Sequence, residues 1–115
     1  MDKNIDKRKN FEEQKKQLLR AILTLKTESE VDMFLEDICT IKEIQDMSQR
    51  LHVAKMLSEG KVFNEVIKET GSSSATISRV NKCLMYGPGG YKMALDRIKE
   101  LTFKAHIRND PYNEV

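Results

Sequence analysis

Apolar residues recur at helical spacing near the start of the chain. The stripe consists of Phe11, Leu18, Leu19, Ile22, Leu23 and Leu25. This spacing predicts an amphipathic helix that ends near residue 26. Because the stripe is broader than one helix face, it needs cover on more than one side, which indicates a partner chain. Residues 1–10 are charged and lack periodic apolar positions, so we expect a mobile N-terminal arm there.

Two threonines, each followed three positions later by a glutamate, predict the starts of two further helices. Thr27 with Glu30 and Thr40 with Glu43 fit the capping box, in which each side chain bonds a backbone N–H near the other. The first of these helices has an apolar face of Val31, Phe34, Leu35 and Ile38. The second is longer and ends near Gly60. Its apolar side consists of Ile41, Ile44, Met47, Leu51, Ala54 and Leu57.

Residues 62–84 have the pattern of a helix-turn-helix, in which two short helices cross at a steep angle. Val66 in the first helix, and Ile77 and Val80 in the second, are apolar where the two helices must pack. Gly71 lies between them and can adopt the left-handed conformation that the turn requires. The pattern alone leaves two interpretations open, because a glycine between short helices also occurs in helical proteins that bind no nucleic acid.

The second helix spans residues 74–84, and its front carries small, hydroxyl-bearing and basic side chains. Ser73 or Ser74 can cap this helix and leave its first backbone N–H groups free for a phosphate. Hydroxyl and methyl groups can contact base edges in the major groove, and the basic side chains are placed for phosphates. No acidic side chain occurs between Glu69 and Asp96 to oppose an approaching polyanion. The candidate DNA-binding residues are Ser72, Ser73, Ser74, Ala75, Thr76, Ser78, Arg79 and Lys82.

The segment Gly87-Pro88-Gly89-Gly90 separates this unit from a last amphipathic helix. Proline stops the preceding helix, and the glycines permit positive φ. The last helix has apolar positions at Tyr91, Ala94, Leu95, Ile98 and Leu101. We therefore expect one helical domain over residues 11–106 and a frayed tail over residues 107–115.

Composition favours an all-α protein and excludes several other classes. The 115 residues include only five Gly and two Pro, too few turn residues for a sheet of many strands. No apolar run approaches the roughly 20 residues needed to span a bilayer. Cys39 and Cys83 have no metal-ligand spacing, so we expect buried free thiols in a reducing cytoplasm and no metal site. His52 and His106 are isolated and no phosphate-binding loop occurs, so we expect no enzyme and no cofactor.

The chain resembles the Trp repressor family, and within it the YerC/YecD type of Trp-repressor-like proteins. The matching segments are Cys39–Ile44, Gln49–Leu51, Val53–Lys55, Glu69–Gly71, Ala75–Val80 and Cys83–Leu84, followed by Tyr86, Gly87, Gly90 and Tyr91. The stretch Ala75-Thr76-Ile77-Ser78-Arg79 after Glu69-Thr70-Gly71 is the most specific part. The resemblance implies six helices per subunit and a homodimer in which the N-terminal helices of two subunits interlock.

The resemblance also implies a pocket for a small-molecule corepressor. Its positions in this chain are Thr40, Arg50, Arg79, Val80 and Cys83. Thr40, Arg50 and Arg79 keep the residue types of the family, so an effector with a carboxylate stays open. Val80 stands where the family has glycine against the indole, and Cys83 stands where it has a hydroxyl. A valine side chain would intrude on a flat ring and a thiol is a weak hydrogen-bonding group, which argues against tryptophan as corepressor.

Two functions are compatible with these observations. The first is a repressor-like transcriptional regulator that binds double-stranded DNA sequence-specifically as a homodimer, with residues 74–84 in the major groove. The second is a homodimeric protein-interaction module whose helix-turn-helix binds no DNA. The net charge of only +2 and the lack of strong base-contacting side chains favour the second function. The acid-free stretch that coincides with the helix-turn-helix favours the first.

Overall fold

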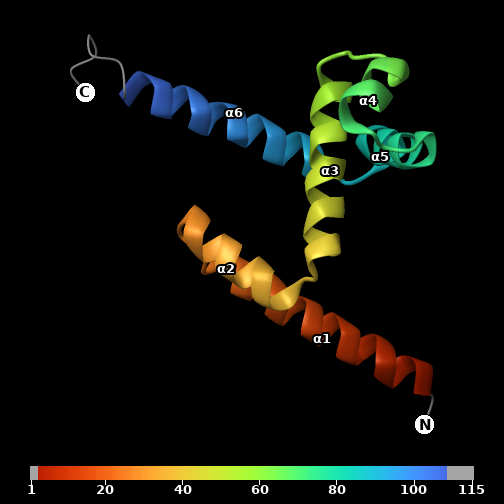
Figure 1. Ribbon diagram of the computed structural model, residues 1–115. Helices are drawn as coiled ribbons and strands as arrows, with labels where there is room; N and C mark the ends of the chain where they lie inside the picture. Colours follow the sequence, from red (N-terminus) through yellow and green to blue (C-terminus); the bar gives the residue numbers. More distant parts are fainter. Residues whose placement is uncertain (1–2, 109–115) are drawn as a thin grey trace. The chain divides into compact units, whose positions relative to one another are not determined.

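The computed structural model describes residues 3–108, with side chains described for residues 6–102. This part of the chain forms six helices and no strand, which confirms the predicted all-α fold (Figure 1). The helices are α1 (Lys3–Leu23), α2 (Glu28–Ile38), α3 (Ile41–Ser58), α4 (Phe63–Thr70), α5 (Ser74–Tyr86) and α6 (Gly90–Arg108). The chain divides into two compact units, Met1–Ile44 and Gln45–Val115. The single domain predicted for residues 11–106 stays a prediction.

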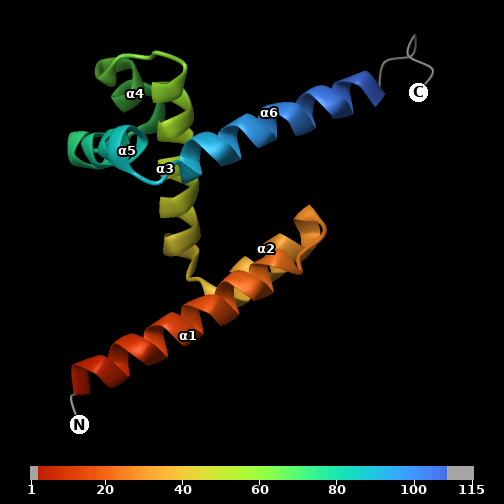
Figure 2. The same cartoon turned by 180° about the vertical axis from the view of Figure 1, so that it is seen from behind.

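The first unit contains α1, α2 and the first turn of α3. Helix α2 turns back along the second half of α1, as both views show (Figures 1 and 2). Helix α1 begins at Lys3, earlier than predicted, so residues 3–10 extend the helix instead of forming a separate arm. The physical reason is that these residues include no Gly or Pro, and extending an existing helix costs far less than starting one.

The two predicted capping signals of this unit are confirmed. Thr27 is the N-cap of α2, and its hydroxyl oxygen accepts a hydrogen bond from the Glu30 N–H at 3.1 Å. At the start of α3, the Thr40 hydroxyl oxygen accepts from the Glu43 N–H at 3.1 Å, and the Thr40 N–H donates to Glu43 Oε1 at 2.9 Å. Thr40 and Glu43 therefore form a reciprocal capping box, which determines where α3 begins.

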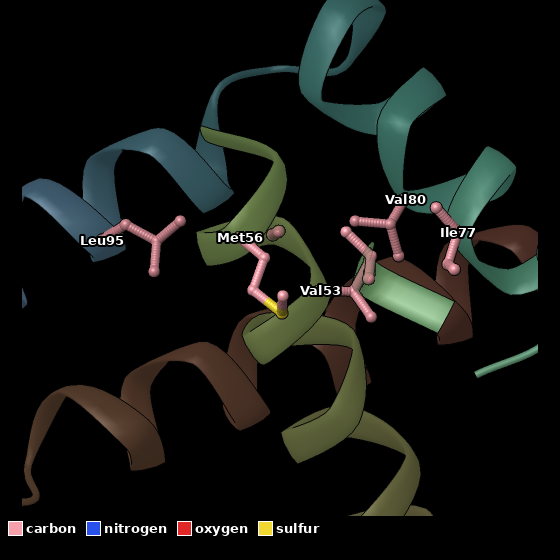
Figure 3. Close-up of a cluster of buried hydrophobic side chains, with 7 residues drawn as sticks. Val53, Met56, Ile77, Val80 and Leu95 are labelled. Atoms are coloured by element: carbon pink, nitrogen blue, oxygen red, sulfur yellow. The ribbon is translucent and has the colours of Figure 1, made fainter. Parts of the chain in front are cut away.

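The second unit has a small hydrophobic core to which α3, α4, α5 and α6 all contribute. Its buried members are Val53, Ala54, Met56, Val66, Ile77, Val80 and Leu95. Figure 3 shows Ile77 and Val80 pointing from α5 toward Val53 on α3, while Leu95 points from α6 toward α3. The predicted packing of Val66, Ile77 and Val80 across the helix-turn-helix is confirmed.

The buried face of α3 differs from the predicted apolar side. Ile41 is 77% exposed and Met47 is 37% exposed, whereas Val53 and Met56, which were not predicted on that side, are buried. The reason is that α5 and α6 approach the second half of α3 from different sides (Figure 3). The covered surface there is wider than one stripe, and a single helical period does not predict it.

Helix α6 contributes less to the core than its apolar pattern predicted. Leu95 is buried and Tyr91 packs against the core, but Ile98 and Leu101 are 45% and 67% exposed. The helix runs away from α3 (Figure 1), so its later turns have less of this unit to pack against. It continues to Arg108, and the rest of the tail predicted at residues 107–115 lies outside the described residues.

Candidate nucleic-acid interface

The turn between α4 and α5 depends on glycine for its backbone conformation. Gly71 ends α4 in the left-handed region, with φ of 69° and ψ of 8°, and its N–H donates to the Ile67 carbonyl at 2.9 Å. A Cβ at Gly71 would meet nothing within 4 Å. Glycine is therefore favoured here because of the positive φ and not because of a lack of space, as the sequence predicted.

Thr70 ties the turn together through three hydrogen bonds. Its hydroxyl donates to the Val66 carbonyl at 2.7 Å and accepts from the Ser72 N–H at 3.1 Å. Its carbonyl accepts from Nε2 of Gln49 on α3 at 3.1 Å. The last turn of α4 is thus linked both to the turn that precedes α5 and to α3.

Ser73 is the N-cap of α5, which settles one of the two predicted alternatives. Its hydroxyl oxygen accepts from the Thr76 N–H at 3.1 Å and its hydroxyl donates to Thr76 Oγ1 at 3.0 Å. The N–H groups of Ser74 and Ala75, in the first turn, have no carbonyl four residues back within the helix to bond. The front of α5 therefore carries N–H donors and the positive end of the helix dipole.

The exposed side of α5 carries most of the predicted DNA-binding residues. The exposed candidates are Ser73, Ser74, Ala75, Ser78, Arg79 and Lys82, and Thr76 is half-buried. Ile77 and Val80 hold the opposite side of the helix in the core, with 0% and 1% exposure. The first turn of α5 has no acidic residue. Because the side that carries Ile77 and Val80 is buried, the other side presents hydroxyl, methyl and cationic groups to solvent.

Ser72 is the exception among these candidates, because its side chain is only 4% exposed. Its hydroxyl is buried and has no hydrogen-bond partner. The side chain is therefore not on the outer surface, and its placement among DNA-contacting residues is corrected. Three consecutive serines are identical in sequence, and only the packing of the turn distinguishes the buried one from Ser73 and Ser74.

The five positions of the implied effector pocket lie in different environments. Thr40 belongs to the first unit, where its side chain and N–H serve the capping box with Glu43. The other four belong to the second unit. Arg50 is half-buried on α3, Arg79 is exposed, Val80 is buried in the core, and Cys83 is exposed. These positions therefore differ in burial, and the Val80 side chain is already packed in the hydrophobic core.

Neither cysteine is a buried thiol, which corrects the expectation from sequence. Both are free, with Cys39 half-buried at the C-cap of α2 and Cys83 exposed on α5. Cys83 lines an apolar cavity of about 360 Å³ at the corner between α5 and α6, together with Leu84, Pro88, Tyr91 and others. Within the described residues, no group of three or more His, Cys, Asp or Glu side chains is placed to hold a metal ion. No helix in that range is long and apolar enough to cross a membrane.

Comparison with known proteins places the chain in one family. Residues 13–99 match the Trp repressor protein family. The chain is 55% identical over 84 residues to the uncharacterized protein YerC of Bacillus subtilis (strain 168), covering 73% of this chain and 81% of that protein. Two crystal structures each cover 73% of this chain with a TM-score of 0.70. One is a TrpR-like protein from Eubacterium eligens ATCC 27750, which is 49% identical to this chain and is covered over 87% of its own length. The other is a candidate Trp repressor from Staphylococcus aureus, which is 46% identical to this chain and is covered over 84% of its own length. The chain therefore belongs to the Trp repressor family and is a Trp-repressor-like protein of the YerC type.

Proposed function

We propose that this protein is a sequence-specific, repressor-like transcriptional regulator that places the front of α5 in the major groove of double-stranded DNA as a homodimer. The observation that carries the proposal is the division of α5 into two faces. Ile77 and Val80 are locked in the core, while the other face presents exposed hydroxyl and basic side chains. Membership of the Trp repressor family supports the same function.

The side chains of α5 suit backbone contacts better than strong base contacts. Arg79 and Lys82 are exposed and follow the capped front of the helix by a turn or more, where phosphates are the expected partners. Ser74, Ala75 and Ser78 are short and reach base edges only at close approach. Sequence preference therefore depends partly on bridging water and on DNA shape.

The homodimer is supported by the apolar surface of the first unit. Large hydrophobic side chains remain exposed along both α1 and α2. They are Phe11, Leu18, Leu19, Ile22, Leu23, Val31, Met33 and Ile38. An apolar surface of this extent is typical of a protein–protein interface. We assign this surface to a second copy of the chain. A symmetric dimer can present two copies of α5, the recognition helices, to successive major grooves, which are about 34 Å apart.

DNA binding is tested by selecting bound sequences from a random duplex pool and measuring affinity by fluorescence anisotropy at several salt concentrations. We expect a near-palindromic preferred site and an affinity that falls steeply with salt. Arg79→Ala and Lys82→Ala should each weaken binding to all sequences and reduce the salt slope by about one. Lys99→Ala, an exposed substitution on α6, is the matched control and should change little. The absence of any salt-sensitive, sequence-preferring binding would contradict the proposal.

The second candidate function is a homodimeric interaction module that binds no DNA. The same exposed apolar side chains of α1 and α2 favour it. This function predicts that the protein still forms a dimer. It also predicts that the anisotropy signal does not differ between the selected duplex and a scrambled one. The anisotropy measurement distinguishes the two functions, because only the regulator discriminates between duplexes.

We further propose that DNA binding does not require tryptophan. The Val80 side chain is 1% exposed and is part of the core between α3 and α5, so a flat indole ring cannot share its place. Adding L-tryptophan should leave the affinity for the selected duplex unchanged within a factor of two. An increase of tenfold or more would show that the core opens to admit the ring.

A further inference from the structure

We propose that Gln49 is a positioning residue for the recognition helix, acting through its hydrogen bond to the carbonyl of Thr70. The inference rests on the proposed DNA-binding function and adds a residue outside the helix-turn-helix to it. Nε2 of Gln49 donates to Thr70 O at 3.1 Å, across 21 positions of the chain. The bond joins the supporting helix α3 to the last residue of α4, directly before the turn.

Thr70 is the point at which this bond can control the turn. Its hydroxyl accepts from the Ser72 N–H on the far side of Gly71, and donates back to Val66 in the core. Val66 is fully buried. Fixing the Thr70 carbonyl against α3 therefore fixes the peptide groups from which α5 starts, and with them the Ser73 cap.

The turn needs this support because it also contains an unfavourable group. The Ser72 hydroxyl is buried without a partner, and burying an unpaired polar group disfavours the closed turn. Opening the turn would let water reach this hydroxyl. The bond from Gln49 favours the closed conformation, in which the front of α5 is held in one orientation for DNA.

The chemistry of the bond explains why an amide is suited to this position. The Thr70 carbonyl requires a donor, and the glutamine amide carries an N–H group at the length needed to reach it. Leucine has nearly the same size but no donor, so it leaves the carbonyl unpaired. A glutamate can donate only when its carboxyl is protonated, and otherwise places a negative charge against the carbonyl oxygen.

The test compares wild type, Gln49→Leu and Gln49→Glu in the full-length protein. Amide hydrogen exchange at Gly71 and Ser72 is measured without DNA, and affinity for the selected duplex is measured by anisotropy. Gln49→Leu should accelerate exchange at both amides and weaken DNA binding about three- to tenfold, the range expected for one hydrogen bond. Gln45→Leu, an exposed substitution one turn earlier on α3, is the control and should change neither.

The pH dependence of Gln49→Glu separates positioning from a general loss of stability. As the pH falls from 7.5 to 4, below the ordinary glutamate pKa of about 4.3, protonation of the introduced carboxyl should restore exchange protection and affinity relative to Gln49→Leu at the same pH. This comparison also serves if Gln49→Leu folds poorly. Wild-type protection in Gln49→Leu, or no pH-dependent recovery in Gln49→Glu, would overturn the inference. So would faster exchange with unchanged affinity. Failure of the wild type to bind any duplex would instead overturn the proposed function, since the exchange measurement does not depend on DNA.

Discussion

Ser72 is surrounded by protein although its side chain is polar. Its hydroxyl has no partner, so the folded protein loses the hydrogen bonds that water supplies in the unfolded chain. Replacing Ser72 with Ala removes this cost and leaves the rest of the turn unchanged. We expect Ser72→Ala to raise the free energy of unfolding by about 1 kcal/mol. Urea denaturation followed by circular dichroism measures the change.

Ser74→Ala is the control for this prediction. Ser74 is exposed at the first position of α5, where a surface substitution changes stability by no more than about 0.5 kcal/mol. If Ser72→Ala destabilised the protein instead, the Ser72 hydroxyl would have to be bonded, for example to a buried water molecule.

Gly87 is required for a reason that the sequence pattern did not indicate. Its φ of −78° suits any residue, but a Cβ there would lie 2.5 Å from the Cys83 carbonyl oxygen. The same carbonyl accepts the Gly87 N–H at 2.8 Å, so relieving the clash would break the bond that ends α5. Gly87→Ala should therefore destabilise the protein by about 1–3 kcal/mol, as overpacking does elsewhere.

Gly90 provides the matched comparison for Gly87. It is the first residue of α6, and a Cβ there would meet nothing within 4 Å. Gly90→Ala should be neutral or stabilise by up to about 1 kcal/mol, because alanine restricts the unfolded chain more than glycine does. Equal melting temperatures for the two variants would contradict the assigned role of Gly87.

At the scale of elements, the start of α3 depends on the ionised form of Glu43. The backbone and side-chain hydrogen bonds with Thr40 hold the pKa of the Glu43 carboxyl below its ordinary value. A lowered pKa means that the stabilisation is fully present above the ordinary carboxyl range and is lost as the pH falls through the lowered pKa. We expect the first turn of α3 to fray over that acidic interval.

A carboxyl titration by NMR, combined with amide exchange at Glu43 and Ile44, tests this prediction. The titration should place the pKa of the Glu43 carboxyl below the ordinary value of a glutamate. Glu43→Gln keeps a side-chain acceptor without the titration, so exchange in its first turn should lose the pH dependence. If both proteins lost protection over the same pH interval, another group would be responsible.

The elements that the sequence predicted well are those whose signals are local. Thr27 and Thr40 each find their capping partner three residues later, and Gly71 adopts the left-handed conformation within its own turn. Such pairings depend on a few neighbouring residues and on fixed helix geometry. For the same reason the helix-turn-helix and the outward-facing residues of α5 could be predicted before the structure.

The features that the sequence did not predict depend on contacts between distant segments. Gln49 and Thr70 are 21 positions apart, and nothing near either residue indicates their hydrogen bond. Val53 and Met56 are buried because two different helices approach α3, and periodicity along α3 alone cannot show this. Ser72 is distinguished from its neighbouring serines only by the packing of the turn.

At the scale of the whole molecule, the first unit keeps a stripe of large apolar side chains exposed along α1. Leu19 and Ile22 are 49% and 46% exposed on α1, and Leu23 is 83% exposed. In the second unit, Ile77 and Val80 of α5 are buried in that unit's own core, while Met85 at the end of the helix is exposed. In the proposed mode of action, the first unit supplies the surface for self-association and the second holds α5, the helix proposed to bind DNA.

This separation predicts what happens when the proposed dimer is disrupted. Leu19→Glu combined with Ile22→Glu places two charges in the apolar surface and should convert the dimer to a monomer, as measured by light scattering after size exclusion. Gln17→Glu, an exposed substitution on the opposite face of the same helix, adds a charge outside the stripe and should leave the dimer intact.

The same monomer should lose DNA affinity in a characteristic way. Binding to a palindromic site draws on two recognition helices at once, and the second contact forms at a high effective concentration once the first is made. The monomer should therefore bind the full site no better than a single half-site, with a loss of about a hundredfold or more relative to the dimer. It should also show about half the salt slope, because half as many phosphates are neutralised. A monomer that kept the full affinity and slope would show that one copy of α5 suffices, which would contradict the proposed symmetric mode of binding.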